Sequence, residues 1–249
     1  MKKRRSRETF VVFCCLFTIL YSLSAVVEAG QSINKRFVYH IYWSGIKAGE
    51  AVLNYEDTPE GVVIKTFAAS APVISIFYKV EDFAQSTLNP DGYPKSFILK
   101  ASEGRHKRDK VTYFESMTDS GKQKITYHDK IKGQRVEFYV DQSAYDPLSA
   151  FYAMTKMSLE EGKSKYIDIF DSKKLYHTEI QVLRKEKVSV PAGDFATILV
   201  KPLLKSEGLF RKTGDILIWA TDDERKLPVL LKSKAPIGTF SVELAEGDY

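Results

Sequence analysis

The four histidines offer the widest range of chemistry in this sequence, but their spacing gives them no shared site. His40, His106, His128 and His177 are scattered along the chain, and none has a second histidine four residues away. No HExxH motif accompanies them, so the ligand spacing of a helical zinc site is missing. The sequence therefore predicts no metal centre, and surface or cross-strand histidines are the simpler interpretation.

The motifs of common nucleophiles and phosphate-binding loops are also missing. The chain contains no G-x-S-x-G elbow, no P-loop and no G-x-G-x-x-G turn, so it predicts no catalytic residue and no cofactor. A pair of carboxylates brought together only by folding stays open, because glycosidases set theirs by distance in space. A hydrolase of that kind is one alternative, although the main interpretation is a protein that is not an enzyme.

One short segment concentrates positive charge. Residues 103–110 read EGRHKRDK, and Arg105, Lys107 and Arg108 are candidates for contact with phosphate or carboxylate groups, since guanidinium groups bind these anions with two hydrogen bonds. Envelope lipids or polysaccharides would supply such groups, which also allows peripheral contact with a membrane. The alternative is a solvated hairpin tip without a partner.

The opening of the chain has the pattern of an export signal. Five basic residues among the first seven precede an apolar run of 18 residues, Phe10 to Val27, which predicts a signal peptide over residues 1–29 with cleavage after Ala29. The competing interpretation is an uncleaved anchor, because a membrane-spanning helix needs only about 20 residues. Cys14 and Cys15 lack the sequence context of a lipidated cysteine. We therefore expect a periplasmic or otherwise exported protein.

Removal of the signal would change the charge and the cysteine content. Five of the 37 basic residues and two of the 32 acidic residues lie within residues 1–29, so the remaining chain is almost balanced. Nucleic acid is not expected as a partner, because that would require basic residues clustered on the folded surface. Both cysteines leave with the signal, so neither a disulfide nor a thiolate nucleophile is expected.

Short β-type segments separated by turn residues fill the rest of the sequence. In Phe37–Trp43 both alternating sets are apolar or aromatic, which predicts a strand covered on both faces. The segments 111–117, 123–128 and 136–140 alternate more clearly and predict strands with one wet face. Further along the chain, the segments 175–183 and 187–190 are expected as separate strands and residues 222–225 as a turn. Without a linker or a repeat, residues 30–249 are expected to form a single domain.

One helix is predicted among the strands. Asp146 suits the cap and Pro147 the first turn, and apolar side chains then recur at helical spacing until Gly162. This predicts an amphipathic helix over 147–161. The segment 72–80 also shows helical spacing, but its residue types allow a strand. The expected fold is mainly β, an antiparallel curved sheet or barrel with the helix packed on its core or mouth.

Aromatic residues are abundant, and they suggest an apolar interior with space for a guest. Small all-β barrels either hold one apolar ligand or fill the interior with side chains. The leading hypothesis is a protein that binds a lipid or another apolar molecule, and the alternative is an envelope assembly partner that acts through its surface. The candidate lining residues are Trp43, Leu148, Phe151, Tyr152 and Trp219.

Several motifs follow the order of a known family. They are FVYHIYWSGIKAGEA at 37–51, FYKVED at 77–82, DPLSAFY at 146–152, VPAG at 190–193 and LPV at 227–229. The sequence resembles domain of unknown function 3108 over nearly all of the expected mature chain. The resemblance implies an exported, β-rich bacterial protein. It brings no established activity, and so no catalytic residue can be assigned from it.

Overall fold

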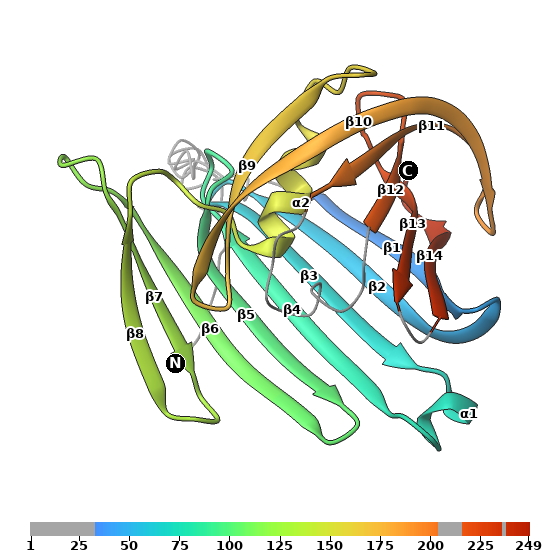
Figure 1. Cartoon of the computed structure of the whole chain (residues 1–249), viewed down its shortest axis with the longest axis horizontal. Coiled ribbons are helices and arrows are strands. Elements are labelled where there is room, and N and C mark those ends of the chain that lie inside the picture. The colour runs from blue at the N-terminus through green and yellow to red at the C-terminus, as the bar shows by residue number, and fades with distance from the viewer. Residues whose placement is uncertain (1–32, 204–215, 236–237) are drawn as a thin grey trace, which may run out of the picture. The chain divides into compact units, whose positions relative to one another are not determined.

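Strands that follow one another in sequence also lie side by side in space and form one antiparallel sheet (Figure 1). The computed structural model describes residues 33–203, 216–235 and 238–249. In this part of the chain the fourteen strands have the order β8-β7-β6-β5-β4-β3-β2-β1-β14-β13-β12-β11-β10-β9. The expectation of a mainly β, antiparallel fold is confirmed.

The sheet consists of two meanders that meet where β1 pairs with β14. The first contains β1 (Ile33–Trp43), β2 (Ile46–Thr58), β3 (Gly61–Ser70), β4 (Val80–Leu88), β5 (Pro94–Glu103), β6 (His106–Met117), β7 (Gln123–Asp129) and β8 (Gln134–Val140). The second contains β9 (Ser164–Asp171), β10 (Lys174–Val190), β11 (Gly193–Pro202), β12 (Ile216–Thr221), β13 (Pro228–Ala235) and β14 (Gly238–Gly247). Helix α1 (Pro72–Ser75) lies between β3 and β4, and α2 (Pro147–Thr155) connects the two meanders.

All of these elements belong to one compact unit, Ser32–Tyr249. The expected signal peptide and its cleavage after Ala29 lie outside the described residues. Neither of the two described helices is long and apolar enough to cross a membrane.

The sheet is strongly curved, but it does not close into a complete barrel. Strands β8 and β9 are its two edges, and in the described chain no backbone ladder joins them. Aromatic side chains fill the seam instead, because the ring of Phe170 on β9 lies 5.1 Å from that of Phe138 on β8 and 6.3 Å from that of Phe114 on β6. Of the two forms expected from the sequence, the open curved sheet is the observed one.

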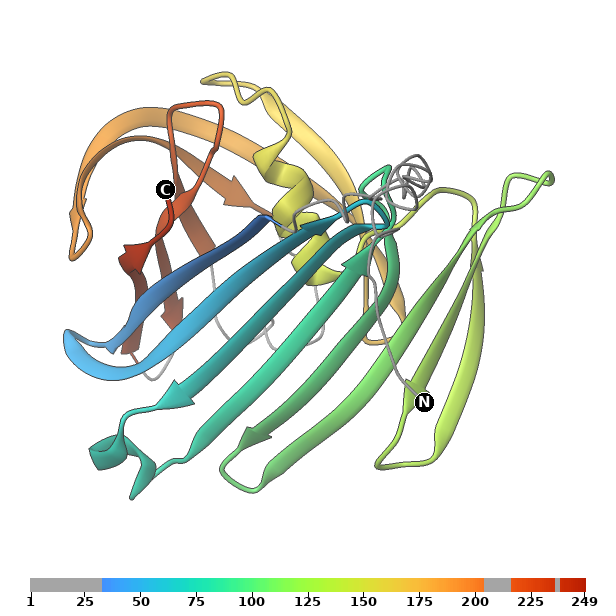
Figure 2. The same ribbon diagram turned by 180° about the vertical axis from the view of Figure 1, so that it is seen from behind.

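Helix α2 lies inside the curve of the sheet (Figure 1 and Figure 2). Its cap is Asp146, whose Oδ1 accepts hydrogen bonds from the backbone N–H groups of Leu148 and Ser149 at 2.9 and 3.0 Å. The Ser86 hydroxyl on β4 donates to Oδ2 at 2.6 Å, which ties the start of the helix to the sheet. Burial raises the pKa of Asp146, while these donors oppose the rise.

The helix is shorter than the sequence predicted. It ends at Thr155 and not at Glu161, because the backbone N–H groups of Lys156 and Met157 bond to carbonyls only three residues back. The following segment then pairs with β10, where the Gly162 N–H donates to the Val182 carbonyl at 2.9 Å. Pairing with the sheet therefore replaces the last helical turns.

Strand β1 supports the expectation of two covered faces over part of its length. Phe37, Val38 and Tyr39 are consecutive, so they point to alternating faces, yet each is at most 7% exposed. Trp43 at the end of the strand is 39% exposed. The coverage is lost there because β1 continues into the hairpin with β2, beyond the core.

One other local expectation was wrong, two strands were not predicted, and one segment had been left open. The segments 175–183 and 187–190 were expected as separate strands, but they are one long strand, β10, with a register shift between Val182 and Arg184. Strands β4 and β5 were not predicted. In the segment 72–80, left open between helix and strand, the structure has one helical turn, α1, followed by the start of β4.

Candidate functional site

Helix α2 divides the concave side of the sheet into two spaces, and the larger one is the main candidate site. It is a cavity of about 380 Å³, within the range of pockets that hold small molecules. Tyr39 and Leu53 line it from the sheet, and Leu148 and Phe151 line it from α2. Most of its other lining residues are also apolar, so it favours an apolar occupant.

A buried hydrogen bond fixes one wall of this cavity. The hydroxyl of Tyr39 donates to the backbone carbonyl of Pro228 at 2.9 Å. Burial raises the pKa of Tyr39, so this hydroxyl stays neutral at ordinary pH. Both residues line the cavity, and the bond therefore sets the distance between β1 and β13 at this point.

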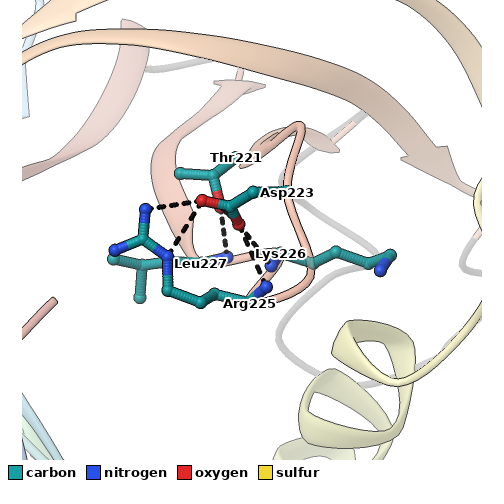
Figure 3. A network of polar contacts seen from close by, with 5 residues as sticks. All are labelled: Thr221, Asp223, Arg225, Lys226 and Leu227. Atoms are coloured by element: carbon teal, nitrogen blue, oxygen red, sulfur yellow. Dashed lines mark hydrogen bonds and ion pairs between the residues drawn. The ribbon is translucent and has the colours of Figure 1, made fainter.

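The turn before Pro228 is held by the polar network of Figure 3. Asp223 accepts hydrogen bonds from the Thr221 hydroxyl at 2.6 Å and from Nε of Arg225 at 2.9 Å. The Leu227 N–H in turn donates to the Thr221 hydroxyl at 2.9 Å. The sequence predicted a turn here, and its network places Leu227 and Pro228 firmly against the interior.

One end of the large cavity is polar. Asp82 and Arg108 line it, and Nη2 of Arg108 donates to Oε1 of Glu103 at 2.6 Å. The Ser102 N–H donates to Oδ1 of Asp82 at 3.1 Å. Burial, together with the neighbouring Glu103 carboxylate, raises the pKa of Asp82 to about 6. This end therefore offers both hydrogen-bond donors and acceptors, whereas the rest of the cavity is largely apolar.

The smaller space lies on the other side of α2. It has a volume of about 140 Å³ and is lined by apolar residues of α2, β9, β10 and β12, such as Met154 and Ile167. Thr178 lines it too, fully buried, and its hydroxyl has no hydrogen-bond partner among the described residues. Unpaired buried hydroxyls are rare, but this oxygen is itself inaccessible and does not face the open space, so the small cavity offers an apolar lining.

Of the predicted lining residues, those of α2 are the ones that the structure brings to cavities. Leu148 and Phe151 line the large cavity, and Phe151 also lines the small one. Tyr152 points elsewhere, into a third and more polar depression of about 280 Å³. There its ring lies 5.7 Å from that of Tyr55.

The two predicted tryptophans lie outside the lining of these three spaces. Trp43 stacks on Phe240 at the edge of the core, with ring centroids 6.4 Å apart. Trp219 is only 6% exposed, and its indole N–H donates to Oε1 of Glu186 at 2.6 Å. Both rings are thus occupied by contacts within the protein.

The basic segment is not the single loop that the sequence suggested. The turn between β5 and β6 is only two residues long, and β6 already begins at His106. Because neighbouring residues of a strand point to opposite faces, Arg108 turns toward the cavity while Lys107 is exposed. Arg105 is exposed as well. The three expected partners of one anion are therefore divided between two faces.

The sequence did not predict Asp82 at the polar end of the large cavity, nor the hydroxyl of Thr178, which is unpaired among the described residues. Asp82 reaches Glu103 and Arg108 only through the pairing of β4, β5 and β6, and no local pattern encodes that register. The family-like motif at 77–82 contains Asp82, which was the one available signal. Thr178 had no signal at all, since it lies in an ordinary strand.

In the described part of the chain, the acidic and histidine side chains do not form a metal site. Among the described residues no three His, Cys, Asp or Glu side chains converge closely enough to hold a metal ion. The Glu103 carboxylate lies near enough to Asp82 to contribute to the raised pKa of Asp82.

An open, curved antiparallel sheet wrapped around one helix, with an apolar cavity between them, defines the class of this protein. Residues 38–245 match the family described as protein of unknown function (DUF3108). The chain belongs to this family, as the sequence motifs suggested.

The solved structures similar to this one include the following two. The first is the crystal structure of a beta-barrel-like protein of domain of unknown function DUF1849 from Brucella abortus, with a TM-score of 0.59, 11% identity, and coverage of 87% of this chain and 97% of that chain. It supports the fold alone. The second is a putative lipoprotein from Parabacteroides distasonis, with a TM-score of 0.30, 13% identity, and coverage of 88% and 96%. No curated protein matches the sequence.

Proposed function

We propose that this protein is exported to the bacterial envelope and binds one apolar or amphiphilic molecule, such as a lipid, in the cavity between the sheet and α2. The observation that carries the proposal is the cavity of about 380 Å³. Most of its lining residues are apolar, and Asp82 and Arg108 add a carboxyl group and a guanidinium group at one end. That division suits a ligand with an apolar body and a single polar group.

The rigid surroundings of the cavity support binding rather than a collapsible core. The Tyr39 hydroxyl holds β13 at a fixed distance from β1, and Asp146 holds α2 against β4. The small cavity on the other side of Phe151 adds apolar space. Export to the periplasm is the part of the proposal that rests on the predicted signal peptide.

A hydrolase is the second candidate, because Asp82 has a raised pKa beside a second carboxylate at the cavity end. Glu103 is already paired with Arg108, whose Nη2 donates to Oε1 of Glu103 at 2.6 Å, so this carboxylate is not free to act on a substrate bond. The cluster is therefore better suited to anchoring a polar headgroup than to acid–base chemistry. Cleavage of lipid or glycoside esters by the wild-type protein, lost in Asp82→Asn, would reverse this preference.

The binding proposal is tested by filling the cavity from one strand. Ala68 lines the cavity, whereas Ala69 is next to it on β3 and points to the opposite face. We expect Ala68→Phe to lose most of the fluorescence enhancement of N-phenylnaphthylamine, a neutral apolar probe, and Ala69→Phe to keep it.

The control measurements separate loss of the cavity from loss of the fold. Circular dichroism should show the same β structure in both variants, and Ala84→Phe, at another lining position, should repeat the result. Equal probe binding by the wild-type protein and Ala68→Phe would contradict the proposal, and so would no binding by a folded wild-type protein.

A further inference from the structure

The connection between β3 and β4 exposes large apolar side chains that no described residue covers. Val73 is 69%, Ile76 77% and Phe77 84% exposed. In Figure 1 the short helix α1 lies beyond the ends of the neighbouring strands, away from α2. We call residues 72–78 the apolar tip. A contiguous exposed cluster of this kind usually marks an interaction site.

The apolar tip is held in place by its backbone. The Ala71 N–H donates to the Ala48 carbonyl at 2.7 Å, and the Tyr78 N–H donates to the Ile74 carbonyl at 2.8 Å. The hydroxyl of Ser70 accepts a hydrogen bond from the Val80 N–H at 2.9 Å. The apolar side chains are thus presented outward by an ordered turn.

The next hairpin adds positive charge beside the apolar tip. The Gly104 N–H, between β5 and β6, donates to the Lys79 carbonyl at 2.8 Å. A Cβ atom at Gly104 would lie only 2.8 Å from the ring of Tyr78, so the two segments are in close contact. Arg105 and Lys107 are exposed on this hairpin and form no ion pair with any residue that the structure describes.

The acidic residues close to the apolar tip do not fully cancel these two charges. Glu81 pairs with Lys79 at 2.9 Å, and Glu103 pairs with Arg108 at 2.6 Å. Asp82, which lines the cavity, is a third acidic residue nearby. Four basic residues (Lys79, Arg105, Lys107 and Arg108) against three acidic ones (Glu81, Asp82 and Glu103) leave an excess of one positive charge near the tip. A partner that binds this surface should have an apolar layer for the side chains of the tip and, next to it, a negatively charged layer for Arg105 and Lys107.

An anionic lipid surface has this arrangement, with phosphate groups above an acyl region. A protein partner fits less well, because stable protein interfaces bury about 800 Å² on each side, and three exposed apolar side chains supply only a part of that area. We infer that the apolar tip docks on an anionic bilayer surface, with Ile76 and Phe77 in the acyl boundary and Arg105 and Lys107 against the phosphates.

This docking goes beyond ligand binding and does not require an occupied cavity. Docking would also bring the polar end of the cavity close to the bilayer, because Asp82 and Arg108 lie on β4 and β6 within a few residues of the docking surface. An amphiphile exchanged with the bilayer would thus reach the cavity from this end.

Cosedimentation with vesicles tests the inference. We expect the purified chain to bind vesicles that contain phosphatidylglycerol and phosphatidylcholine, and to bind vesicles of phosphatidylcholine alone much more weakly. The double variant Ile76→Ser, Phe77→Ser should bind at least tenfold more weakly. Arg105→Gln with Lys107→Gln should lose roughly fivefold for each cation on the anionic vesicles, or about 25-fold in all.

A matched control comes from another exposed aromatic residue. Tyr139 on β8 is 61% exposed, so Tyr139→Ser should leave vesicle binding unchanged. Equal binding by the wild-type protein and the tip variants would overturn the inference, as would a wild-type protein that sediments with neither vesicle. A dimer in solution that Phe77→Ser dissociates, without vesicle binding, would assign the surface to a second copy of the chain instead.

The result is separable from the proposed function. Probe binding by Ile76→Ser, Phe77→Ser should equal that of the wild-type protein, because the tip does not line the cavity. Loss of probe binding in Ala68→Phe with intact vesicle binding would show that the two sites are independent.

Discussion

The two helices in the described part of the chain begin alike but lie in opposite environments. Each follows a strand and has proline in its first turn. Helix α2 has the buried cap Asp146 and packs inside the sheet, whereas α1 has Ala71 at the cap position, without a side-chain hydrogen bond, and no buried residue. The apolar residues around α1 lie in the open.

This difference separates residues that hold the fold together from residues that are free to contact a partner. Where the cap is satisfied and the side chains are buried, as in α2, substitutions should cost stability. Where backbone hydrogen bonds and the Ser70 hydroxyl fix a turn, as in α1, the exposed apolar side chains can be exchanged at little cost to the fold. Exposed Ile76 and Phe77 therefore do not contribute to the core, which is why an external partner is the simplest reason for them.

The largest effect is expected at the cap of α2. Asp146→Ala should lower the free energy of unfolding by about 3 to 4 kcal/mol, because it removes a helix cap and leaves buried donors, including the Ser86 hydroxyl, without their acceptor. Urea unfolding measures this change in the free energy of unfolding. The matched variant at the cap of α1, Ala71→Gly, should change stability by less than about 1 kcal/mol. Similar losses at the two caps would contradict the comparison.

A smaller effect on the free energy of unfolding is expected from the titration of Asp82, at the polar end of the cavity. The pKa of Asp82 is raised to about 6, above the value of about 3.9 in an unfolded chain, so the folded state binds this proton more tightly. The resulting stabilisation is complete below about pH 4 and is lost as the pH rises through about 6. Because Asp82 is partly exposed, solvent screening limits the effect to about 1 kcal/mol.

Urea unfolding between pH 4 and 7 checks this pH dependence. The stability of the wild-type protein should fall relative to that of Asp82→Asn across this range, while Asp91→Asn, in an exposed turn, should follow the wild-type curve. Parallel curves for the wild-type protein and Asp82→Asn would show that the carboxyl group does not titrate as described.

The smallest effect is expected at the apolar tip. Phe77→Ser should change the free energy of unfolding by less than about 0.5 kcal/mol, because the side chain is 84% exposed. Thermal unfolding followed by circular dichroism is sufficient to detect a larger change. A loss of 2 kcal/mol or more would mean that the tip packs against the protein in solution.

Local sequence patterns predicted the parts of the fold that depend on neighbouring residues. The cap and first turn of α2 follow from Asp146 and Pro147, and the covered strand β1 follows from the run at 37–43. The end of α2 was wrong because Gly162 bonds to β10, a partner distant in sequence. The continuity of β10 was missed for a related reason, since its pairing with β11 carries it through the polar residues 184–187.

Of the residues that line the large cavity, only those on helix α2 could be predicted from the sequence. Leu148 and Phe151 follow from helical spacing, and both line the large cavity. Trp43 and Trp219 lie outside the cavity, because residue type alone does not indicate which face of a strand a side chain occupies. Arg108 was placed with its basic neighbours, but strand alternation turns it inward beside Asp82.

Native mass spectrometry of the protein purified from its own cells tests the central claim most directly. The account predicts that the wild-type protein and Ala69→Phe carry the extra mass of one apolar or amphiphilic molecule, and that Ala68→Phe carries none. A wild-type protein with the mass of the bare polypeptide, or the same extra mass on Ala68→Phe, would contradict it.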